Sequence, residues 1–304
     1  MNRAVITIFL ILIFYIGFVA FSDLNKISNI SFNFNLVPLI LLFTLSSFVV
    51  MGIRQFFLLK QIGITISVKE NIKLYLSGLS MVISPGGSGQ LIKSYYIKKK
   101  YNHEIKKTLP LVFVEKFIDL ICITTLIISS LLFVQNMEIV FLVIIIVMII
   151  VVVILTLRFK KLFTVFVKIL SKTPFFKKFV EDSNYFYNSL NKMISIKSIS
   201  IGFIFGMLSF SFDAMAIYFV FMAFNVDLHF FNMVASIYPS ILYGSFSFIP
   251  GGVGVTELSA VRLLTDEGIS TSLSSAIILT IRFTTLWFAT LIGFIMTKVF
   301  LKNN

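Results

Sequence analysis

The sequence predicts an all-α, polytopic membrane protein with about six full transmembrane helices and two re-entrant helical hairpins in an inverted repeat. Three observations predict this fold class: the composition, the length of the apolar runs, and the repetition of one proline-glycine motif. Of the 304 residues, 58% are hydrophobic and only 13% are charged. A soluble domain has about 25% charged residues. The composition therefore excludes a soluble domain.

Apolar runs long enough to cross a hydrocarbon core of roughly 30 Å recur along the chain. They cover residues 4–21, 36–59, 108–134, 138–157, 199–224 and 270–298. The first run resembles a signal peptide, but no A-x-A-like cleavage site follows it, so we expect a retained helix. Because most of the chain belongs in lipid, we expect a single integral membrane domain over residues 1–304.

Lysine and arginine are unevenly distributed among the connections. Segments 60–73, 93–107 and 158–198 are basic, whereas the other connections between apolar runs hold a single lysine and no arginine. Cytoplasmic loops carry the excess of positive charge in membrane proteins. We therefore expect these segments and the N-terminus on the cytoplasmic side of the cytoplasmic membrane. The positive charges that make up the net charge of +13 would then lie beside the membrane and attract anionic lipid, and no nucleic acid partner is expected.

The apolar piece 72–92 lies between two basic segments, so it must enter and leave the membrane from the same side. It is predicted to be a re-entrant hairpin whose tip is Ser84-Pro85-Gly86-Gly87-Ser88-Gly89. Segment 231–264 is predicted to enter from the outside, with the tip Pro250-Gly251-Gly252-Val253-Gly254. An alternative stays open, in which 231–249 is a full span and the C-terminus lies outside.

Two units of the chain follow the same plan. Each reads as a span, a hydrophobic helix that ends in P-G-G-x-G, a second short helix and another span. The units cover about 36–134 and 199–298, and they are joined by the span 138–157 and the basic segment 158–198. Because the first unit starts outside and the second inside, they are inverted copies. Many transporters use this arrangement to build a site near the membrane midplane.

The P-G-G-x-G tips are expected to form part of that site. Proline ends a helix and glycine permits close backbone approach, and broken helices occur in membranes only where protein or water surrounds them. The helices that follow Gly89 and Gly254 would direct their N-termini at an anionic head group. Neither tip matches the G-x-x-x-x-G-K-[ST] pattern, so an ATP-driven reaction has no support.

Charged residues inside the apolar runs are unfavourable by about 2.5–3.5 kcal/mol each on insertion scales, so each indicates a partner or a function. They are Arg54, Glu115, Lys116, Asp119, Asp213, Glu257, Arg262 and Arg282. Glu115 and Asp119 are four residues apart and share a helix face, and Lys116 is expected to point away from it. For Arg54, snorkelling to the nearby membrane surface remains an alternative.

Asp213 and Arg282 lie near the middle of long apolar runs, where snorkelling is difficult. We expect both to face the space between the two hairpins, within reach of Glu257 or Arg54. Charges that face a shared cavity would bind an anionic or zwitterionic head group, or relay protons.

No motif indicates catalysis or a cofactor. Cys122 is the only cysteine, which excludes disulfide frameworks and cysteine-based metal sites. The two histidines, His103 and His229, lie in loops and are expected to be ordinary polar residues. Within segment 158–198, apolar and basic residues fall on opposite helix faces, which predicts a basic amphipathic helix on the inner leaflet that attracts anionic lipid.

These motifs together resemble the lysylphosphatidylglycerol synthase transmembrane family, which includes the flippase domain of MprF-like proteins and stand-alone relatives. The likeness covers most of the chain, in the family's order. The matching stretches are MGIRQFFLLKQIG around Arg54, SPGGSGQLIKSYYIKKK, VEKFIDL at 114–120, IPGGVGVTELSAVRLL at 249–264, and LTIRFTTLW around Arg282. The chain departs from the family at Gln90 and Lys93, where glutamate and arginine are common, and at Glu115-Lys116, where E-R is common.

The resemblance implies a flippase that moves a lipid between leaflets, such as an aminoacyl-phospholipid or a polyprenyl-linked carrier. No aminoacyl-transferase domain follows Asn304, so we do not expect an enzyme. A secondary transporter of a small solute or ion and a non-catalytic partner of an envelope lipid or glycan enzyme stay open, as does a homo-oligomer. The substrate-binding residues are predicted to be Arg54, Pro85, Gly86, Gly87, Gly89, Gln90, Lys93, Glu115, Asp119, Asp213, Pro250, Gly251, Gly252, Gly254, Glu257 and Arg282.

Overall fold

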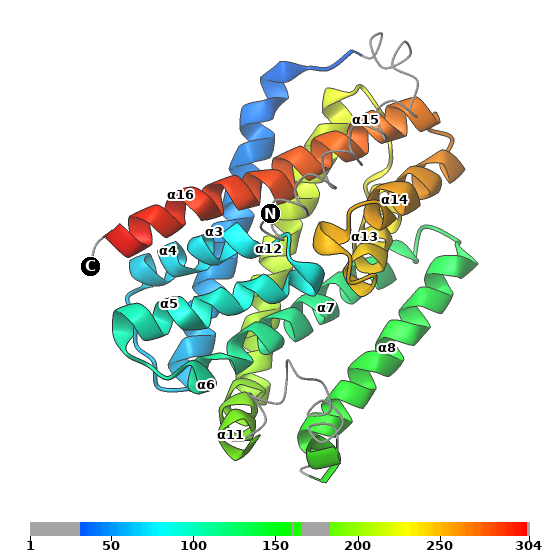
Figure 1. The fold of residues 1–304 in the computed structure, drawn as a ribbon. Coiled ribbons are helices and arrows are strands. Elements are labelled where there is room, and N and C mark those ends of the chain that lie inside the picture. Colours follow the sequence, from blue (N-terminus) through cyan, green and yellow to red (C-terminus); the bar gives the residue numbers. More distant parts are fainter. Residues whose placement is uncertain (1–30, 160, 166–182, 303–304) are drawn as a thin grey trace, which may run out of the picture.

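A computed structural model describes residues 31–159, 161–165 and 183–302, and within these ranges the chain forms helices and no strand (Figure 1). The first predicted span, 4–21, and residues 160 and 166–182 of the basic segment 158–198 lie outside the described residues. The helices are η1 Phe34–Leu36, α3 Val37–Gln61, α4 Val68–Gly78, η2 Leu79–Met81, η3 Pro85–Leu91, α5 Ile92–Tyr101, α6 Ile105–Thr108, α7 Pro110–Ser130, α8 Met137–Arg158, α11 Ser183–Met193, α12 Ile196–Ala223, α13 Phe230–Phe246, η4 Pro250–Gly252, α14 Val255–Asp266, α15 Thr271–Arg282, η5 Phe283–Trp287 and α16 Phe288–Lys302.

Helices long and apolar enough to cross a membrane confirm the predicted membrane protein. By length and composition, the described residues contain four of them, Phe34–Gln61, Met137–Leu157, Ile196–Ala223 and Thr271–Leu301. They correspond to the runs 36–59, 138–157, 199–224 and 270–298. The run 108–134 forms α7, which has 21 residues but contains Glu115, Lys116 and Asp119.

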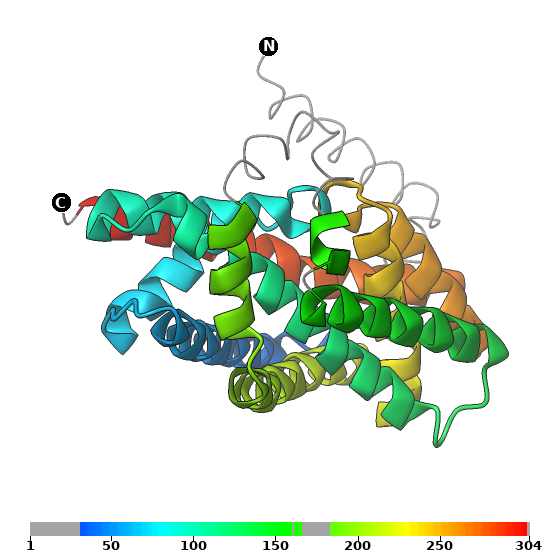
Figure 2. The same ribbon diagram turned by 90° about the horizontal axis from the view of Figure 1, so that it is seen from below.

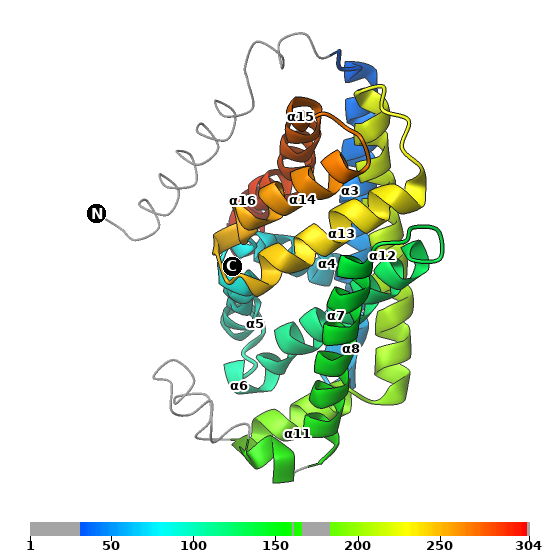
Figure 3. The ribbon, with the colours of Figure 1, turned by 90° about the vertical axis from the view of Figure 1, so that its right-hand side faces the viewer.

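The two long helices α3 and α12 run antiparallel, side by side (Figure 3). Asn33, just before η1, donates a backbone hydrogen bond of 2.8 Å to the carbonyl of Ala223 at the end of α12. Near the middle of both helices, the hydroxyls of Ser47 and Ser209 lie 2.8 Å apart. Membrane helices associate through small residues and hydrogen bonds across the interface. The Ser47–Ser209 contact has this character and fixes the register of the pair.

The segment predicted to form the first hairpin folds back on itself as α4, η2, η3 and α5. Ser67 caps the start of α4 by accepting a hydrogen bond of 3.3 Å from Glu70 N. The chain then reverses, and α5 returns beside α4, so that Lys100 Nζ at its end lies 2.9 Å from Glu70 Oε2. The two ends of the hairpin therefore meet, and the glycine tip lies at the far end.

The second predicted hairpin has the same plan, with α13 and α14 packed side by side. Its open end is closed by a hydrogen bond of 2.6 Å from Asn232 Nδ2 to Glu267 Oε2. Near its tip the two arms of the hairpin approach so closely that a Cβ on Gly252 would lie 2.9 Å from Gly244 Cα.

The two glycine tips contact each other near the centre of the molecule. A Cβ on Gly251, in the second tip, would lie 3.5 Å from Ile83 Cγ2, beside the first tip. Figures 1 and 3 show the turn between α13 and α14 next to the start of α5. The hairpins therefore point toward one another, with their open ends apart.

One long helical segment, α15–η5–α16, contacts both hairpins. α15 packs on α14 of the second hairpin, and α16 packs on α4 and η2 of the first. A Cβ on Gly293 of α16 would overlap the backbone of Ser80, so only glycine permits this approach. At its far end, the carbonyl of Phe300 lies 3.5 Å from Lys100 Nζ. The last helix thus ends beside the open end of the first hairpin.

The three basic segments meet at one end of the molecule. A cleft of about 250 Å³ is lined by Ile62 from segment 60–73, Lys107 from segment 93–107, and Asn188, Ser189 and Lys192 from segment 158–198. The charge pattern predicted that all three lie on one side of the membrane, and the fold places them together. At the edge of the bundle, α8 presents an apolar surface that is largely exposed (Figure 2).

Candidate functional site

A buried ion pair joins α3 to α7. Arg54 Nη1 lies 2.7 Å from Asp119 Oδ1, and the two side chains are 1% and 16% exposed. Space for the guanidinium comes from α12, because a Cβ on Gly206 would lie 3.3 Å from Arg54 Nη1 and 2.6 Å from Cys122 Sγ. Arg54 is therefore enclosed between three helices, and the snorkelling alternative is wrong.

A second buried pair joins the first hairpin to α7. Lys93, at the start of α5, forms an ion pair with Glu115, and these side chains are 1% and 2% exposed. The stem of Lys93 passes over Gly78, where a Cβ would lie 2.7 Å from Lys93 Cδ. Lys93 Nζ also lies 5.1 Å from the centre of the Tyr75 ring. The predicted site residues Glu115 and Asp119 do share a face, but each binds a different cation.

An amide network fastens the first hairpin to α3 beside these pairs. Gln55 Nε2 donates to Asn71 Oδ1 at 2.9 Å, and Asn71 Nδ2 donates to the carbonyl of Gly52 at 2.6 Å. Within the described ranges, Arg54 Nε, Gln55 Oε1 and Glu115 Oε1 are buried and lack a hydrogen-bond partner. Because an unsatisfied buried polar atom costs about 1–3 kcal/mol, these atoms give the cluster spare capacity to bind a polar ligand.

At the second tip, one arginine holds the turn together. Arg282 Nε lies 2.7 Å from Glu257 Oε1, and Arg282 also donates from Nη2 to the carbonyl of Gly251. Glu257 in turn accepts a hydrogen bond of 2.7 Å from the backbone N–H of Gly254. The backbone at Gly251 has φ +64°, which glycine adopts without strain. Glu257 is 0% exposed and Arg282 is 11% exposed.

This arrangement modifies the prediction for the helix after Gly254. The N-terminus of α14 was expected to attract an external anion, but the carboxylate of Glu257 already caps it. A phosphate group could reach Arg282 by replacing Glu257 as its partner. The predicted contact between Arg282 and Glu257 is confirmed.

At the first tip, a cation that was not among the predicted binding residues, Lys116, lies against the glycine turn. A Cβ on Gly87, where φ is +68°, would lie 3.4 Å from Lys116 Cε and 3.8 Å from Lys116 Nζ. Lys116 Nζ also lies 3.3 Å from Asp119 Oδ2, and its side chain is 43% exposed. The prediction that Lys116 points away from the acidic face was wrong, because its long stem reaches the carboxylate three residues later.

The two tips are thus matched in their chemistry. In each half, a cation on the helix after the hairpin lies against the glycine turn, Lys116 at the first tip and Arg282 at the second. The signal is present in the sequence, because VEKF at 114–117 and TIRF at 280–283 align on the cation and the phenylalanine that follows it.

Asp213 has a neutral partner. The hydroxyl of Tyr238 donates to Asp213 Oδ2 at 3.2 Å, which joins α12 to α13. Its predicted proximity to Arg54 or Glu257 stays a prediction.

The remaining predicted residues form the first turn. Gln90 is 5% exposed, and it lies with Pro85, Gly86, Gly87 and Gly89 in η3. Gly89 N donates to the hydroxyl of Ser84, which closes the turn. In the part of the chain that the structure describes, no group of three or more His, Cys, Asp or Glu side chains could hold a metal ion.

Outside the apolar helices, the open end of the first hairpin is electrostatically stabilised. Hydrogen bonds from Lys100 and Lys73 lower the pKa of Glu70 from 4.5 to about 2. Burial, and then the charge of Glu70, raise the pKa of the Tyr101 phenol to about 12. Glu70 is therefore ionised in the folded protein over the physiological range.

Comparison with known proteins gives two matches. The family model described as "Lysylphosphatidylglycerol synthase TM region" matches residues 4–293. A UPF0104 membrane protein of Methanothermobacter thermautotrophicus is 31% identical over 103 residues, which are 34% of this chain and 31% of that protein. The match thus spans about a third of that relative's length.

Proposed function

The chain belongs to the lysylphosphatidylglycerol synthase transmembrane family, and from this membership we propose that it is a flippase of the cytoplasmic membrane. Its substrate is an anionic or zwitterionic lipid, such as an aminoacyl-phospholipid or a polyprenyl-linked carrier. The protein moves this lipid between leaflets and catalyses no change in its covalent structure.

The observation that carries the proposal is the placement of the two hairpins along one helix. The segment Thr271–Leu301 has 31 residues, which at 1.5 Å per residue extend about 46 Å, enough to cross a bilayer. It starts shortly after the open end of the second hairpin and ends beside the open end of the first. The two tips contact each other between these ends.

This geometry supports hairpins that enter the membrane from opposite faces. The first would enter from the cytoplasm, because its open end carries Lys73 and Lys100 and the basic segments belong inside. The second would enter from the outside, which places the C-terminus in the cytoplasm. The units about 36–134 and 199–298 would then be inverted repeats around a central site.

In the proposed mechanism, the cations at the tips bind the lipid phosphate. Lys116 serves the first turn and Arg282 the second, and each is held in the resting protein by an acid, Asp119 or Glu257. A phosphate displaces the acid when it binds, and the acid displaces the phosphate when the lipid leaves. Because the acid competes for the cation, binding stays weak enough for release.

In the proposed mechanism, Arg54 and Lys93 lie deeper in the helix bundle than the cations at the tips. Their pairs with Asp119 and Glu115 are buried, so they set the position of α7 and its Lys116. The unpartnered Arg54 Nε and Glu115 Oε1 leave hydrogen-bonding capacity for head-group atoms. Gln90 is proposed to donate to the head group from the turn itself.

A second candidate is a non-transporting membrane partner of an envelope lipid or glycan enzyme. The tight packing of the Lys93–Glu115 pair, which is 1% and 2% exposed, favours it. A packed ion pair fixes helix positions without any need for a moving substrate.

The deciding experiment measures leaflet exchange of fluorescent lipids in proteoliposomes that contain the whole chain. Wild type, Arg282→Lys and Lys116→Gln are compared, with Lys69→Gln at an exposed surface position as the matched control. Exchange that the two tip variants slow and the control leaves unchanged supports the flippase. If wild type exchanges none of the lipid classes tested, the second candidate is favoured.

A further inference from the structure

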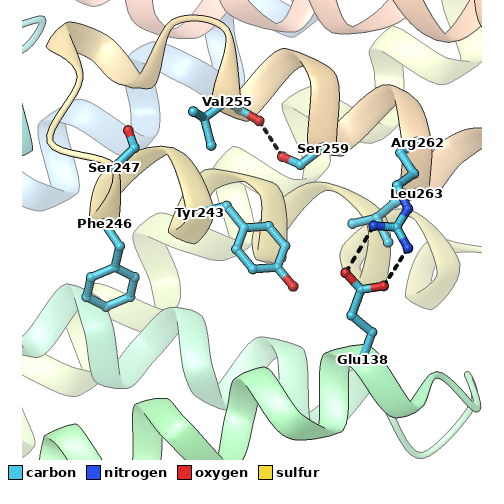
Figure 4. A pocket seen from close by; sticks show the side chains of 8 residues that line it. All are labelled: Glu138, Tyr243, Phe246, Ser247, Val255, Ser259, Arg262 and Leu263. Atoms are coloured by element: carbon cyan, nitrogen blue, oxygen red, sulfur yellow. Dashed lines mark hydrogen bonds and ion pairs between the residues drawn. The ribbon is translucent and has the colours of Figure 1, made fainter.

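A cleft outside the central site runs between α8 and the second hairpin (Figure 4). Its volume is about 470 Å³. At one end lie Glu138 of α8 and Arg262 of α14, and at the other end lie Phe246, Ser247 and Val255, beside the second glycine tip. The cleft is therefore charged at one end and mostly apolar at the other.

The charged end is a two-point ion pair between the two helices. Arg262 Nη2 lies 2.9 Å from Glu138 Oε2, and Nη1 lies 3.4 Å from Oε1. The side chains are 65% and 45% exposed. An exposed pair of this kind contributes only about 0.2–1 kcal/mol, so a ligand can separate the partners at little cost.

A membrane-spanning α8 would place the ion pair at the depth of the head groups. Glu138 is in the first turn of α8, and residues 139–155 of that helix are all apolar. Arg262 lies close to the end of α14, at the open end of the second hairpin. From Arg262 back to Val255, seven residue steps of α14 extend roughly 10 Å toward the tip. The cleft thus descends from head-group depth to acyl-chain depth.

We propose that this cleft binds one zwitterionic phospholipid in the leaflet that contains the start of α8. The phosphate takes Arg262, the ammonium takes Glu138, and an acyl chain lies along Phe246. The inference rests on the proposed function, because the deep end of the cleft adjoins the tip that Arg282 holds. The cleft is then the lateral path between that leaflet and the central site.

Charge complementarity selects a zwitterionic lipid over an anionic one. A zwitterionic head group offers one anion and one cation, which replace both halves of the Arg262–Glu138 pair. A purely anionic head group would satisfy Arg262 but leave Glu138 unpaired beside a phosphate, and like charges at this distance repel. Tyr243 lines the cleft between its two ends and offers a hydroxyl to the ester region. Ser259 also lines it there, with its hydroxyl donated to the carbonyl of Val255.

The test uses tryptophan fluorescence and lipids with brominated acyl chains, which quench an indole in contact. The single native tryptophan is removed as Trp287→Phe, and Phe246→Trp places a reporter inside the cleft. A control reporter, Ile145→Trp, replaces a residue of α8 that is 51% exposed. Vesicles contain brominated phosphatidylethanolamine or brominated phosphatidylglycerol at equal fractions.

The expected result is a preference for phosphatidylethanolamine of up to about fivefold at the cleft reporter, which is what an exposed charge pair supplies. Glu138→Gln removes this preference, and Arg262→Gln weakens quenching by both lipids. The control reporter shows no preference. Equal quenching curves for the two lipids at the cleft reporter overturn the proposal.

A second measurement needs no reporter. Native mass spectrometry of the wild-type chain from mixed vesicles should show one retained phosphatidylethanolamine that Glu138→Gln loses. Retention unchanged in Glu138→Gln contradicts the site. Leaflet exchange in the same vesicles separates the two proposals. A preference for phosphatidylethanolamine without exchange supports this lipid site and refutes the flippase. Exchange without that preference supports the flippase and refutes this lipid site.

Discussion

Arg282 Nε lies 2.7 Å from Glu257 Oε1, so the last long helical segment is tied to the first turn of α14. The same guanidinium donates to the carbonyl of Gly251. One planar side chain therefore holds both sides of the second glycine turn, which a single ammonium cannot do in the same geometry.

The first prediction follows from this fork. Arg282→Lys keeps the charge but loses one of the two contacts, and a hydrogen bond to a charged group contributes about 1.5–3 kcal/mol. Lipid exchange should slow by about tenfold or more, while the protein stays folded. Arg282→Ala also breaks a buried pair, which costs about 3–5 kcal/mol of stability. Exchange rates and thermal unfolding in detergent measure the two effects, and unchanged exchange in Arg282→Lys contradicts the proposed role.

The second prediction concerns Lys116 at the first turn. Because this side chain is 43% exposed, Lys116→Gln should leave thermal stability within about 0.5 kcal/mol of wild type. Exchange should nevertheless slow, and Lys116→Glu should slow it further by repelling the lipid phosphate. Lys69→Gln, also an exposed lysine, is the control. Equal exchange in Lys116→Gln and Lys69→Gln would remove Lys116 from the mechanism.

The third prediction concerns the direction of the hairpins. In a Cys122→Ala background, Lys69→Cys reports on the open end of the first hairpin and Asp266→Cys on that of the second, and both positions are exposed. An impermeant thiol reagent should label Lys69→Cys from the cytoplasmic face and Asp266→Cys from the opposite face. Labelling of both from one face refutes the inverted arrangement.

The fourth prediction concerns the close approach of α16 and the first hairpin. A methyl group at Gly293 would overlap the backbone of Ser80, and overpacking of this kind costs about 1–3 kcal/mol. Gly293→Ala should therefore lower the unfolding temperature. Phe294→Ala removes a side chain that is 54% exposed and serves as the control. Equal stability of Gly293→Ala and wild type would mean that α16 moves away without cost.

The fifth prediction is a pH dependence. The folded protein lowers the pKa of Glu70 from 4.5 to about 2 through Lys100 and Lys73, so the unfolded chain binds this proton more readily. The contribution of Glu70 to stability is complete above pH 4.5 and disappears as the pH falls to about 2. Thermal unfolding should show wild type more stable than Glu70→Gln at pH 7, with the difference vanishing toward pH 2. A constant difference between pH 7 and pH 2 would contradict the assignment.

Much of this architecture could be predicted from local signals. The apolar runs predicted the long helices, and the basic segments on both sides of 72–92 predicted the first hairpin. The contact between Lys100 and Glu70 joins the two ends of that hairpin. Partners across the bundle could not be predicted in the same way. Lys93 and Glu115 are 22 residues apart, and no spacing rule connects them.

The partner of Asp213 is the hydroxyl of Tyr238, and a neutral donor leaves no charge signal in the sequence. The error over Lys116 has a physical cause. Lys116 was assigned by its helical angle alone. Its side chain is long enough to curve around the helix to Asp119 and to lie against Gly87, so angle was a poor guide to where the ammonium lies.

The π-helical turn Phe283–Trp287 follows Arg282 directly and separates α15 from α16. A π turn holds one more residue than an α turn, so every later residue is turned by about 100° relative to an unbroken α-helix. The face of α15 that packs on the second hairpin and the face of α16 that packs on the first are therefore set by two registers of one continuous helix. The change of register falls directly after Arg282, the residue that holds the second tip.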